Sequence, residues 1–472
     1  MSTPDCDGEP LLSRGASEAT LVSRSVEVEA GSLGAFLRAP YSSEEESTET
    51  SFLWNGRGAG TVLAGRGDTA TVVAEGNERF RKVDEAVDVL FSDVDTDTAD
   101  GTPDGVRPRL FGGFSFHDAH EAAGVWSEFP SARFVLPRYQ FASHGERHYL
   151  TVNGYGTDVD PDRLEEEAAD FRASLARFEG NGTGKTPEIL GVERKTRLPE
   201  WRQQVNEALR RIESGDIEKV VLSQSLNIRL GSRVDARWQA LRLSEAYPDC
   251  YGFLFSPEGG PGFFGASPER LVSVEGREVE TEATAGSIGR GECPDEDEEL
   301  GSRLRNSEKD LHEHRLVAED IVERLRPLSE SVEAGETEML RLENVQHLRT
   351  PVTARLRRTE DHTALSIAEA LHPTPAVGGL PPKESLRTIR ETEGFERGWY
   401  AAPVGWVDAD GDGCFAVGIR SAVAEGSTVR PFAGAGIVGD SDPDEEWDEI
   451  NLKYEPVLGL FGSEKGETVG AD

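Results

Sequence analysis

Arg430-Pro-Phe-Ala-Gly-Ala-Gly-Ile-Val-Gly439, followed by Asp440 to Lys453, is the stretch around which the chain is organised. It predicts a strand that runs into a glycine turn, with an acidic helix opening behind it. The helix start, Asp442-Pro443-Asp444-Glu445, combines an aspartate N-cap with a proline at the first helical position and a glutamate at the third. The stretch therefore indicates a strand, a turn and a well-capped helix in succession.

The glycines of this stretch formally spell the G-x-G-x-x-G of dinucleotide-binding loops, at Gly434, Gly436 and Gly439. The acidic residues that follow argue against that function, because they would repel a pyrophosphate at the helix N-terminus. Glycine amides that approach a small anion closely fit better. Glu446 and Glu449 share one face of the predicted helix, and they would bring carboxylates to a hard cation bridging to that anion.

The composition is that of a strongly acidic protein, with 88 Asp and Glu against 50 Lys and Arg and a formal net charge of -38. Such a charge repels nucleic acid and anionic membranes, so neither is expected as a partner. Only eight of the basic residues are lysines. We interpret the acidic surface as halophilic, because at ~1 M salt the Debye length is about 3 Å and self-repulsion is largely screened.

Cysteine usage and the absence of targeting patterns predict a soluble cytoplasmic protein. The four cysteines are scattered without a C-x-x-C pair, which indicates reduced thiols. The first dozen residues lack the basic and apolar regions of a signal peptide. No apolar stretch approaches the roughly 18 residues that a membrane-spanning helix needs.

The order of predicted elements favours an α+β fold in which helices wrap antiparallel β-sheets in one compact catalytic unit. Gly180 to Thr186 is interpreted as a flexible linker and not a P-loop, because Glu179 stands where the first glycine of that loop belongs. We expect an N-terminal segment with a mobile start, an N-terminal α+β part, a catalytic region and a tail, at residues 1–50, 51–180, 190–462 and 463–472.

Several local elements are predicted that bear on the site. Ser302 to Leu325 reads as one long helix, Ala416 to Ser421 as a strand that ends near the glycine turn, and residues 94–105 as a polar loop. Asp408 to Gly413 begins like a calcium-binding loop, but Ile419 stands where the bidentate glutamate belongs, so a hairpin turn is predicted.

Lys219 and Glu269 are the first candidates for chemistry. Lys219 lies inside the apolar strand predicted from Glu218 to Leu230, where it is either functional or an edge-strand lysine that prevents aggregation. Glu269 lies in a Ser-Pro-Glu-Arg turn, and a glutamate at such a turn is more often a cap or a solvated charge.

Glu313 lines up with Val317 and Ile321 at four-residue steps, so it faces the core side of its helix. A lone carboxylate there is costly unless it is paired or bound to a metal. The flanking His312 and His314 do not share a helix face, which argues against a zinc site.

Two further candidates leave alternatives open. His347 is either functional or a satisfied core histidine. Arg420 suits a bidentate contact with a carboxylate, or it forms a structural ion pair.

Taken in order, these signals resemble the chorismate-utilising enzymes, most closely those that make isochorismate. The resemblance covers about Leu198 to Phe461, and more loosely the segments around Phe111 and Phe134. The matching blocks are Lys219-Val-Val-Leu-Ser223, Phe264-Gly-Ala-Ser-Pro-Glu269, Ala285-Gly-Ser287, Ser307-Glu-Lys-Asp-Leu-His-Glu-His314, His347-Leu348, Leu371-His-Pro-Thr-Pro-Ala-Val-Gly-Gly-Leu-Pro381, Val417-Gly-Ile-Arg-Ser421, Phe432-Ala-Gly-Ala-Gly-Ile-Val438 and Glu446-Trp-Asp-Glu449 with Lys453.

The resemblance implies that chorismate is converted to isochorismate with Mg²⁺, for menaquinone synthesis. Lys219 would be the base that activates water and Glu269 the acid that protonates the departing hydroxyl. The implied Mg²⁺ ligands are Glu313, Glu446 and, through water, Glu449. The implied substrate-binding residues are Gly286, Ser287, His347, Arg420, Gly434, Ala435, Gly436 and Lys453.

These roles make physical demands on the two catalytic candidates. A lysine with the ordinary pKa of about 10.4 is neutral in only about 1 of 2,500 molecules at pH 7. Lowering that pKa to about 7 takes roughly 4.6 kcal/mol of environment, which burial and nearby cations can supply. Glu269 must instead have a raised pKa, so that it holds its proton until the proton is needed.

Lys219 separates the nearest relatives, because the members that add ammonia lack it and carry a Gly-Ala-Pro-Lys block near Ala376 to Pro381. A water-adding enzyme without a glutaminase subunit is therefore expected. A salicylate synthase, which goes on to eliminate pyruvate, and a catalytically silent chorismate-binding protein are the alternatives. Two departures are Gln224, where an arginine is usual, and Pro456, which should kink the final helix.

Overall fold

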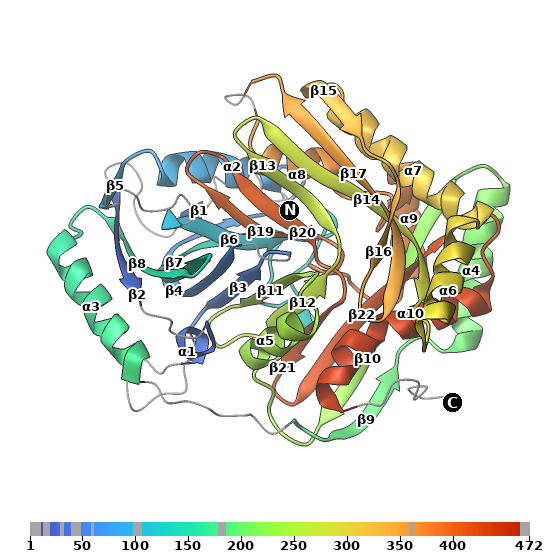
Figure 1. Ribbon diagram of the computed structural model, residues 1–472, viewed down its shortest axis with the longest axis horizontal. Coiled ribbons are helices and arrows are strands. Elements are labelled where there is room, and N and C mark those ends of the chain that lie inside the picture. The colour runs from blue at the N-terminus through green and yellow to red at the C-terminus, as the bar shows by residue number, and fades with distance from the viewer. Residues whose placement is uncertain are drawn as a thin grey trace, which may run out of the picture.

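The computed structural model describes residues 11–12, 19–28, 33–38, 49–57, 61–97, 106–177, 186–358 and 362–462 (Figure 1). The expected mobile start at residues 1–10, the linker residues 180–185 and the tail at 463–472 lie outside the described residues. The strands pair antiparallel almost throughout, and helices cover their outer faces. The prediction of an α+β fold with antiparallel sheets in one compact unit is confirmed.

Strand β7 (Ala132–His144) is the centre of the N-terminal part. It pairs along its whole length with β4 (Val62–Ala74), while β6 (Arg109–Phe114) and β8 (Arg147–Gly156) share its other side. Phe134, Leu136 and the neighbouring apolar side chains are fully buried in this region. Two chains of strands extend from this centre into the C-terminal part.

The first chain of strands begins at β4 and leads to the strand that carries Lys219. Each neighbour pairs antiparallel with the next. In order, its members are β3 (Ser51–Asn55), β11 (Tyr251–Ser256), β12 (Gly262–Ser267), β21 (Ser421–Glu425), β22 (Thr428–Ile437) and β10 (Lys219–Leu230).

The second chain of strands begins at β6 and leads to the strands that carry Gly286 and His347, again with antiparallel pairing. In order, its members are β19 (Pro403–Asp408), β20 (Gly413–Val417), β13 (Arg270–Glu275), β14 (Glu278–Gly289) and β17 (Val345–Leu356). The shorter strands at the margins are β1 (Leu11–Leu12), β2 (Thr20–Val28), β5 (Val94–Asp97), β9 (Ile189–Arg194), β15 (Ser329–Ala334), β16 (Glu338–Arg341) and β18 (Gly379–Leu380).

Helices α7 and α10 supply the two helical walls of the site. Helix α7 packs on β14, and α10 packs on β22. The helices are α1 (Leu33–Arg38), α2 (Arg79–Leu90), α3 (Pro161–Arg177), α4 (Leu198–Glu213), α5 (Ala236–Ala246), α6 (Pro294–Arg305), α7 (Glu308–Leu325), α8 (Ala364–Leu371), α9 (Pro382–Thr392) and α10 (Pro443–Leu458), with 3-10 turns at Gly124–Trp126 and Gly459–Phe461.

Two of the expected elements are wrong in extent. The single helix expected from Ser302 is two helices, because Ser307 begins a new one: its Oγ accepts a hydrogen bond from the backbone N–H of Asp310 at 3.2 Å. The polar loop expected at 94–105 begins with β5, which pairs parallel with β2. The hairpin turn at Asp408 is as expected.

The structure also corrects the turn predicted within Arg430 to Lys453. Gly434 and Gly436 do not form a turn, since they lie in β22 and pair with Ser223 and Val221 of β10. The turn follows them, and Asp442 then caps α10 by accepting hydrogen bonds from the next two backbone amides. Helix α10 continues through Pro456 to Leu458.

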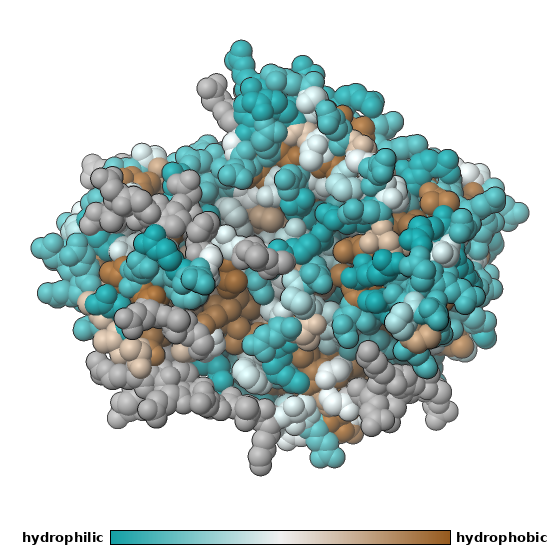
Figure 2. All heavy atoms as spheres, in the orientation of Figure 1, coloured by the Kyte–Doolittle hydropathy of each residue, from teal (hydrophilic) through white to brown (hydrophobic). Residues whose placement is uncertain are grey.

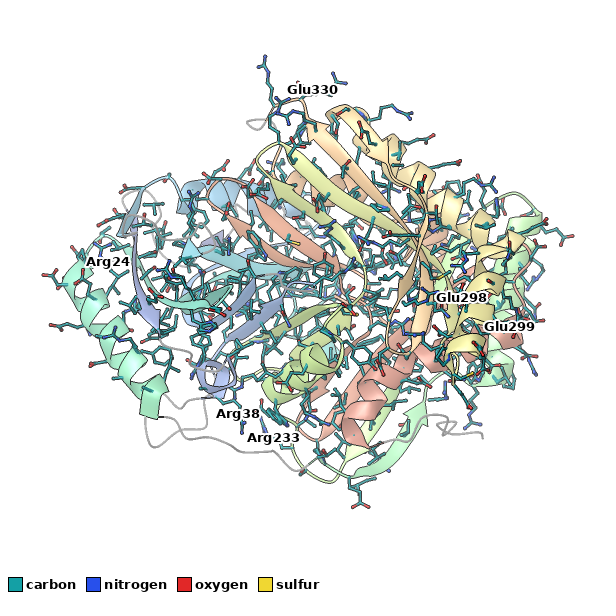
Figure 3. The ribbon with its side chains drawn as sticks, viewed as in Figure 1. Arg24, Arg38, Arg233, Glu298, Glu299 and Glu330 are labelled. Carbon is teal, nitrogen blue, oxygen red and sulfur yellow. The ribbon has the colours of Figure 1, made fainter. Side chains whose placement is uncertain are left out.

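The surface matches the composition. Hydrophilic residues dominate the face shown in Figure 2. Figure 3 shows Glu298 and Glu299 on α6 and Glu330 on β15 at the outside of the molecule, and all three are exposed. Among the helices of the described ranges, none has the length and apolar character needed to cross a membrane.

Candidate active site

A pocket lies where the far ends of the two chains of strands face each other, in the right half of Figure 1. Strands β10 and β22 form one wall, β14 and β17 form another, and α7 and α10 complete it. The residues that line it are Val221, Ser223, Pro268, Glu269, Thr284, Ala285, Gly286, Ser287, Glu313, His347, Ala376, Val377, Tyr400, Ala401, Ile419, Arg420, Phe432, Ala433, Gly434, Gly436, Glu449 and Lys453. Most of the predicted site residues therefore come together.

Lys219 is buried next to this pocket and forms an ion pair with Glu313, which lines it. Its side chain is 0% exposed, and its Nζ is 2.8 Å from Glu313 Oε1. Since β10 pairs with both β22 and β18, the interpretation of Lys219 as an edge-strand lysine is wrong. A Cβ on Gly436 would lie 2.3 Å from Glu313 Oε1, so the glycine leaves room for the pair.

Two more carboxylates stand next to this pair, and each has its own lysine. Lys309 Nζ donates to Glu446 Oε1 at 2.7 Å, and Lys453 Nζ lies 2.5 Å from Glu449 Oε1. Burial and the neighbouring Glu449 raise the pKa of Glu446 to about 7. Burial would also raise the pKa of Glu449, but Lys453 and Lys309 hold it below its ordinary value. Three of the eight lysines in the chain thus lie here.

The three carboxylates are suitable ligands for a hard divalent cation. Mg²⁺ takes oxygen ligands, and a cation would relieve the repulsion between Glu446 and Glu449. In the described part of the chain, however, no three His, Cys, Asp or Glu side chains already converge as a metal-binding cluster. Each carboxylate contacts a lysine instead, so binding a metal would require these ion pairs to rearrange.

Glu269 lies on the opposite side of the pocket in a dry environment. It is 4% exposed, so it is not a solvated turn residue. Ser267 Oγ accepts from its backbone N–H at 3.2 Å, and Thr374 Oγ1 lies 3.5 Å from its Oε1. Burial and the charge of Glu282 raise the pKa of Glu269 to about 8, against the opposing effect of Lys219. At neutral pH the carboxyl is protonated.

Arg420 and His347 form a polar corner of the pocket. Arg420 has φ 51° and lies after the end of β20, so it does not belong to a strand as expected. It is buried, its Nη2 is 3.4 Å from His347 Nε2, and its Nη1 has no hydrogen-bond partner among the described residues. Within those residues it forms no ion pair, which leaves a carboxylate ligand as its natural partner.

His347 is not merely a satisfied core histidine, because it lines the pocket. Its Nδ1 is 2.9 Å from Ser287 Oγ and 3.3 Å from the carbonyl oxygen of Gly286. Burial, Arg420 and Lys453 lower its pKa well below the ordinary value, so the imidazole is neutral. Gly286, at φ 75°, makes the bend in β14 that places Ser287 opposite His347.

Three predicted residues do not line the pocket. Lys219 and Glu446 are buried in ion pairs with Glu313 and Lys309. Ala435 alternates with Gly434 and Gly436 along β22, so its side chain faces away from the pocket. The sequence patterns do not predict Lys309, Thr374 and Tyr400 as site residues. Lys309 could have been found, because lysines are rare here and it precedes Glu313 by one helical turn.

Comparisons with known proteins agree with this geometry. Residues 11–462 match the family described as chorismate binding enzyme. The chain belongs to the chorismate binding enzyme family. It is 36% identical to isochorismate synthase MenF of Bacillus subtilis over 366 residues, 76% of each chain. It is 37% identical to the salicylate biosynthesis isochorismate synthase of Pseudomonas aeruginosa over 389 residues, which cover 80% of this chain and 78% of the relative.

Solved structures of the family share the fold. Menaquinone-specific isochorismate synthase MenF from Escherichia coli aligns with a TM-score of 0.76 at 24% identity, covering 93% of this chain and 94% of that one. Anthranilate synthase component I from Streptococcus pneumoniae aligns at 0.65 and 22% identity, covering 89% and 95%. The predicted resemblance to chorismate-utilising enzymes is thereby confirmed.

Proposed function

We propose that this enzyme is an isochorismate synthase that depends on Mg²⁺. The observation that supports this most strongly is that Glu269 lines the pocket, while Lys219 of β10 is buried against Glu313, which lines the same pocket. A buried amine and a buried protonated carboxyl are what the addition of water and the loss of hydroxide require. The family membership and the names of the relatives point to the same reaction.

In the proposed reaction, water attacks C2 of chorismate while the C4 hydroxyl leaves. The side-chain nitrogen of Lys219 takes a proton from the attacking water, and Glu269 donates a proton to the departing hydroxyl. Holding both groups against one bound ring removes the need to gather them from solution. General acid and base groups each contribute about 10²- to 10⁴-fold in rate.

Binding a substrate with two carboxylates in so acidic a protein requires local positive charge. Arg420 and Lys453 supply it from the chain itself, and the neutral His347 and Ser287 add polar contacts without adding charge. Glu313, Glu446 and Glu449 would hold Mg²⁺, which supplies further positive charge at a carboxylate of the substrate. The backbone of Gly434 and Gly436 allows the ligand to come close to β22.

Analysis of the products tests the proposal directly. The protein is incubated with chorismate and Mg²⁺ in molar KCl, and the products are separated by chromatography. Isochorismate as the sole product is the expected result. Release of pyruvate with salicylate would make the protein a salicylate synthase, and binding of chorismate without turnover would make it a silent binding protein.

Menaquinone synthesis is the proposed use of the product, because several relatives carry the name MenF. The chemistry needs one polypeptide and no ammonia, so no glutaminase subunit is proposed. A cytoplasmic location and activity at high salt are proposed on the composition, with its scattered cysteines and a net charge of -38.

A further inference from the structure

Glu282 is a buried carboxylate that the proposed reaction does not use. It lies on β14, and its side chain is 0% exposed. Arg57 donates to it through Nη1 at 3.0 Å and Nη2 at 2.5 Å, and Arg349 donates through Nε at 2.5 Å. Burial would raise the pKa of Glu282, but the two arginines hold it below its ordinary value, so the group is charged.

A buried charge cluster of this kind is weak evidence for a purely stabilising role. Apolar residues of the same volume often stabilise a core as well as a buried ion pair does. Arg57 follows β3 in the N-terminal part, whereas Glu282 and Arg349 belong to the C-terminal strands β14 and β17. The cluster therefore joins two distant parts of the chain at one place, and that place adjoins the pocket.

The cluster holds the turn that carries Glu269 from both sides. Arg57 Nη2 donates to the carbonyl oxygen of Pro268, the residue before it. Glu282 Oε1 accepts from the backbone N–H of Arg270, the residue after it, at 3.0 Å. The backbone of Glu269 thus cannot move unless these contacts break.

Glu282 also faces Glu269 with a negative charge. After burial, Glu282 is the largest influence that raises the pKa of the Glu269 carboxyl. The groups that oppose it come from other elements: Lys219 from β10, Lys453 from α10 and the hydroxyl of Thr374. If the charge of Glu282 were removed, these groups together with Arg57 and Arg349 would favour the ionised form of the Glu269 carboxyl.

We propose that Glu282, together with Arg57, is a positioning residue for Glu269: it fixes the turn that presents the acid and faces the acid with a fixed negative charge. This inference rests on the proposed role of Glu269 as the acid. It assigns a function to an arginine from the N-terminal part, none of whose described residues lines the pocket.

The test is Glu282→Gln in the full-length enzyme with Mg²⁺ and chorismate. Glutamine keeps the shape and an acceptor for the Arg270 amide but removes the charge. The alkaline limb of the kcat/KM profile should move to lower pH by about one unit, which lowers the rate about tenfold at pH values above the pKa of the wild type. The KM for chorismate at low pH should stay within about twofold, since Glu282 does not touch the substrate pocket.

Glu338→Gln is the matched control. Glu338 is the exposed partner of the same Arg349, at 2.7 Å from its Nη1. This variant removes an equal charge from the same arginine but not from the neighbourhood of Glu269, so its pH profile should equal that of the wild type. An equal shift in both variants would overturn the proposal.

Arg57→Lys separates geometry from charge. Lysine keeps a cation beside Glu282 but cannot reach both Glu282 and the Pro268 carbonyl. We therefore expect kcat to fall about tenfold, while the alkaline limb of the kcat/KM profile stays at the same pH as in the wild type. If Glu282→Gln does not fold, this variant decides alone: unchanged kcat contradicts the proposal. A folded Glu282→Gln that has lost thermal stability but keeps the pH profile of the wild type also contradicts it.

A titration without turnover keeps this inference apart from the proposed function. Infrared difference spectra between the wild type and Glu269→Gln report the ionisation of Glu269 directly. The Glu282→Gln background should lower that pKa even if the enzyme made a product other than isochorismate. An unchanged pKa would refute the influence of Glu282 whatever the reaction is.

Discussion

The glutamates on the two sides of the pocket have different charged neighbours. On the side of α7 and α10, Glu313, Glu446 and Glu449 each contact a lysine. On the other side Glu269 is 4% exposed and forms no ion pair among the described residues, and the charge with the largest influence on its pKa is that of Glu282. The first side is thus suited to cations and to substrate carboxylates, whereas the second stores a proton.

This contrast explains how buried glutamates of one pocket can differ in charge at the same pH. Lys453 and Lys309 hold the pKa of Glu449 below its ordinary value, whereas burial and Glu282 raise the pKa of Glu269 to about 8. All four residues are glutamates, so the residue type alone does not determine their roles. Their roles depend on the neighbouring charges. The predictions below alter one side and leave the other intact.

The largest expected effect comes from Lys219→Ala. Without the amine, water has no general base, so kcat should fall about 10²- to 10⁴-fold while chorismate still binds. Steady-state rates and equilibrium binding of chorismate measure the two effects separately. Lys383→Ala, on the exposed start of α9, is the matched control. Normal turnover by Lys219→Ala would require a different base.

Glu313→Gln should act mainly on the metal side. The amide is a poorer ligand for a hard cation, so binding of Mg²⁺ measured by calorimetry should weaken by about tenfold or more. Rates at saturating Mg²⁺ should recover in part. If Mg²⁺ binds this variant and the wild type equally well, Glu313 is not a ligand.

Gly436→Ala tests the space between Lys219 and Glu313. The new Cβ would lie 2.3 Å from Glu313 Oε1 and 3.2 Å from Lys219 Cε, so the carboxylate must move. We expect kcat to fall about tenfold with little change in the thermal unfolding temperature, because a side-chain end can shift at low cost. Gly459→Ala, at the end of α10 with φ -59° and no atom within 4 Å of the new Cβ, is the control for the substitution itself.

The proton on Glu269 sets the pH dependence. The pKa is raised to about 8, so the acid is protonated below that pH and loses its proton above it. The kcat/KM should therefore fall about tenfold for each pH unit above the pKa of Glu269, while protonation of the base Lys219 governs the limb at lower pH. A pH series of initial rates checks this, and a rate that rises through the same range would contradict the role of Glu269 as an acid.

Of the changes considered, salt should have the smallest effect on the residues of the pocket. It should have a larger effect on the stability of the fold. The net charge of -38 lies mostly on the surface, where salt screens it. Raising KCl from millimolar to about 1 M should stabilise the protein by roughly 1 kcal/mol or more, measured as a higher unfolding temperature. Equal unfolding temperatures at both concentrations would show that the fold does not depend on screening.

Much of the fold could be predicted because local patterns dictated it. The local signals are the apolar run of β10, the proline and aspartate at the start of α10, and the stripe of Glu313, Val317 and Ile321; all three match the structure. The break between α6 and α7 was missed because a serine cap inside a helical pattern is a weak signal. The glycines of β22 suggest a turn in the sequence, whereas in the structure Gly434 leaves room for Ser223 of β10 and Gly436 for Glu313 of α7.

The site was predictable as a set of residues but not as a set of pairs. The ordered motifs named Glu313, Glu446 and Glu449, yet no sequence spacing relates Glu446 to Lys309 or Glu313 to Lys219. The contact of Arg57 with Glu282 joins positions 225 residues apart. Such contacts depend on tertiary packing, which hydrophobic periodicity and secondary-structure propensity do not predict.

The source of the new hydroxyl oxygen tests the central claim most directly. The enzyme is supplied with chorismate and Mg²⁺ in heavy-oxygen water, and the isochorismate formed is examined by mass spectrometry. If an amine on one side activates water while a carboxylic acid on the other releases hydroxide, one heavy oxygen enters the ring at C2 in every turnover. Isochorismate that carries only the original oxygen would contradict the account.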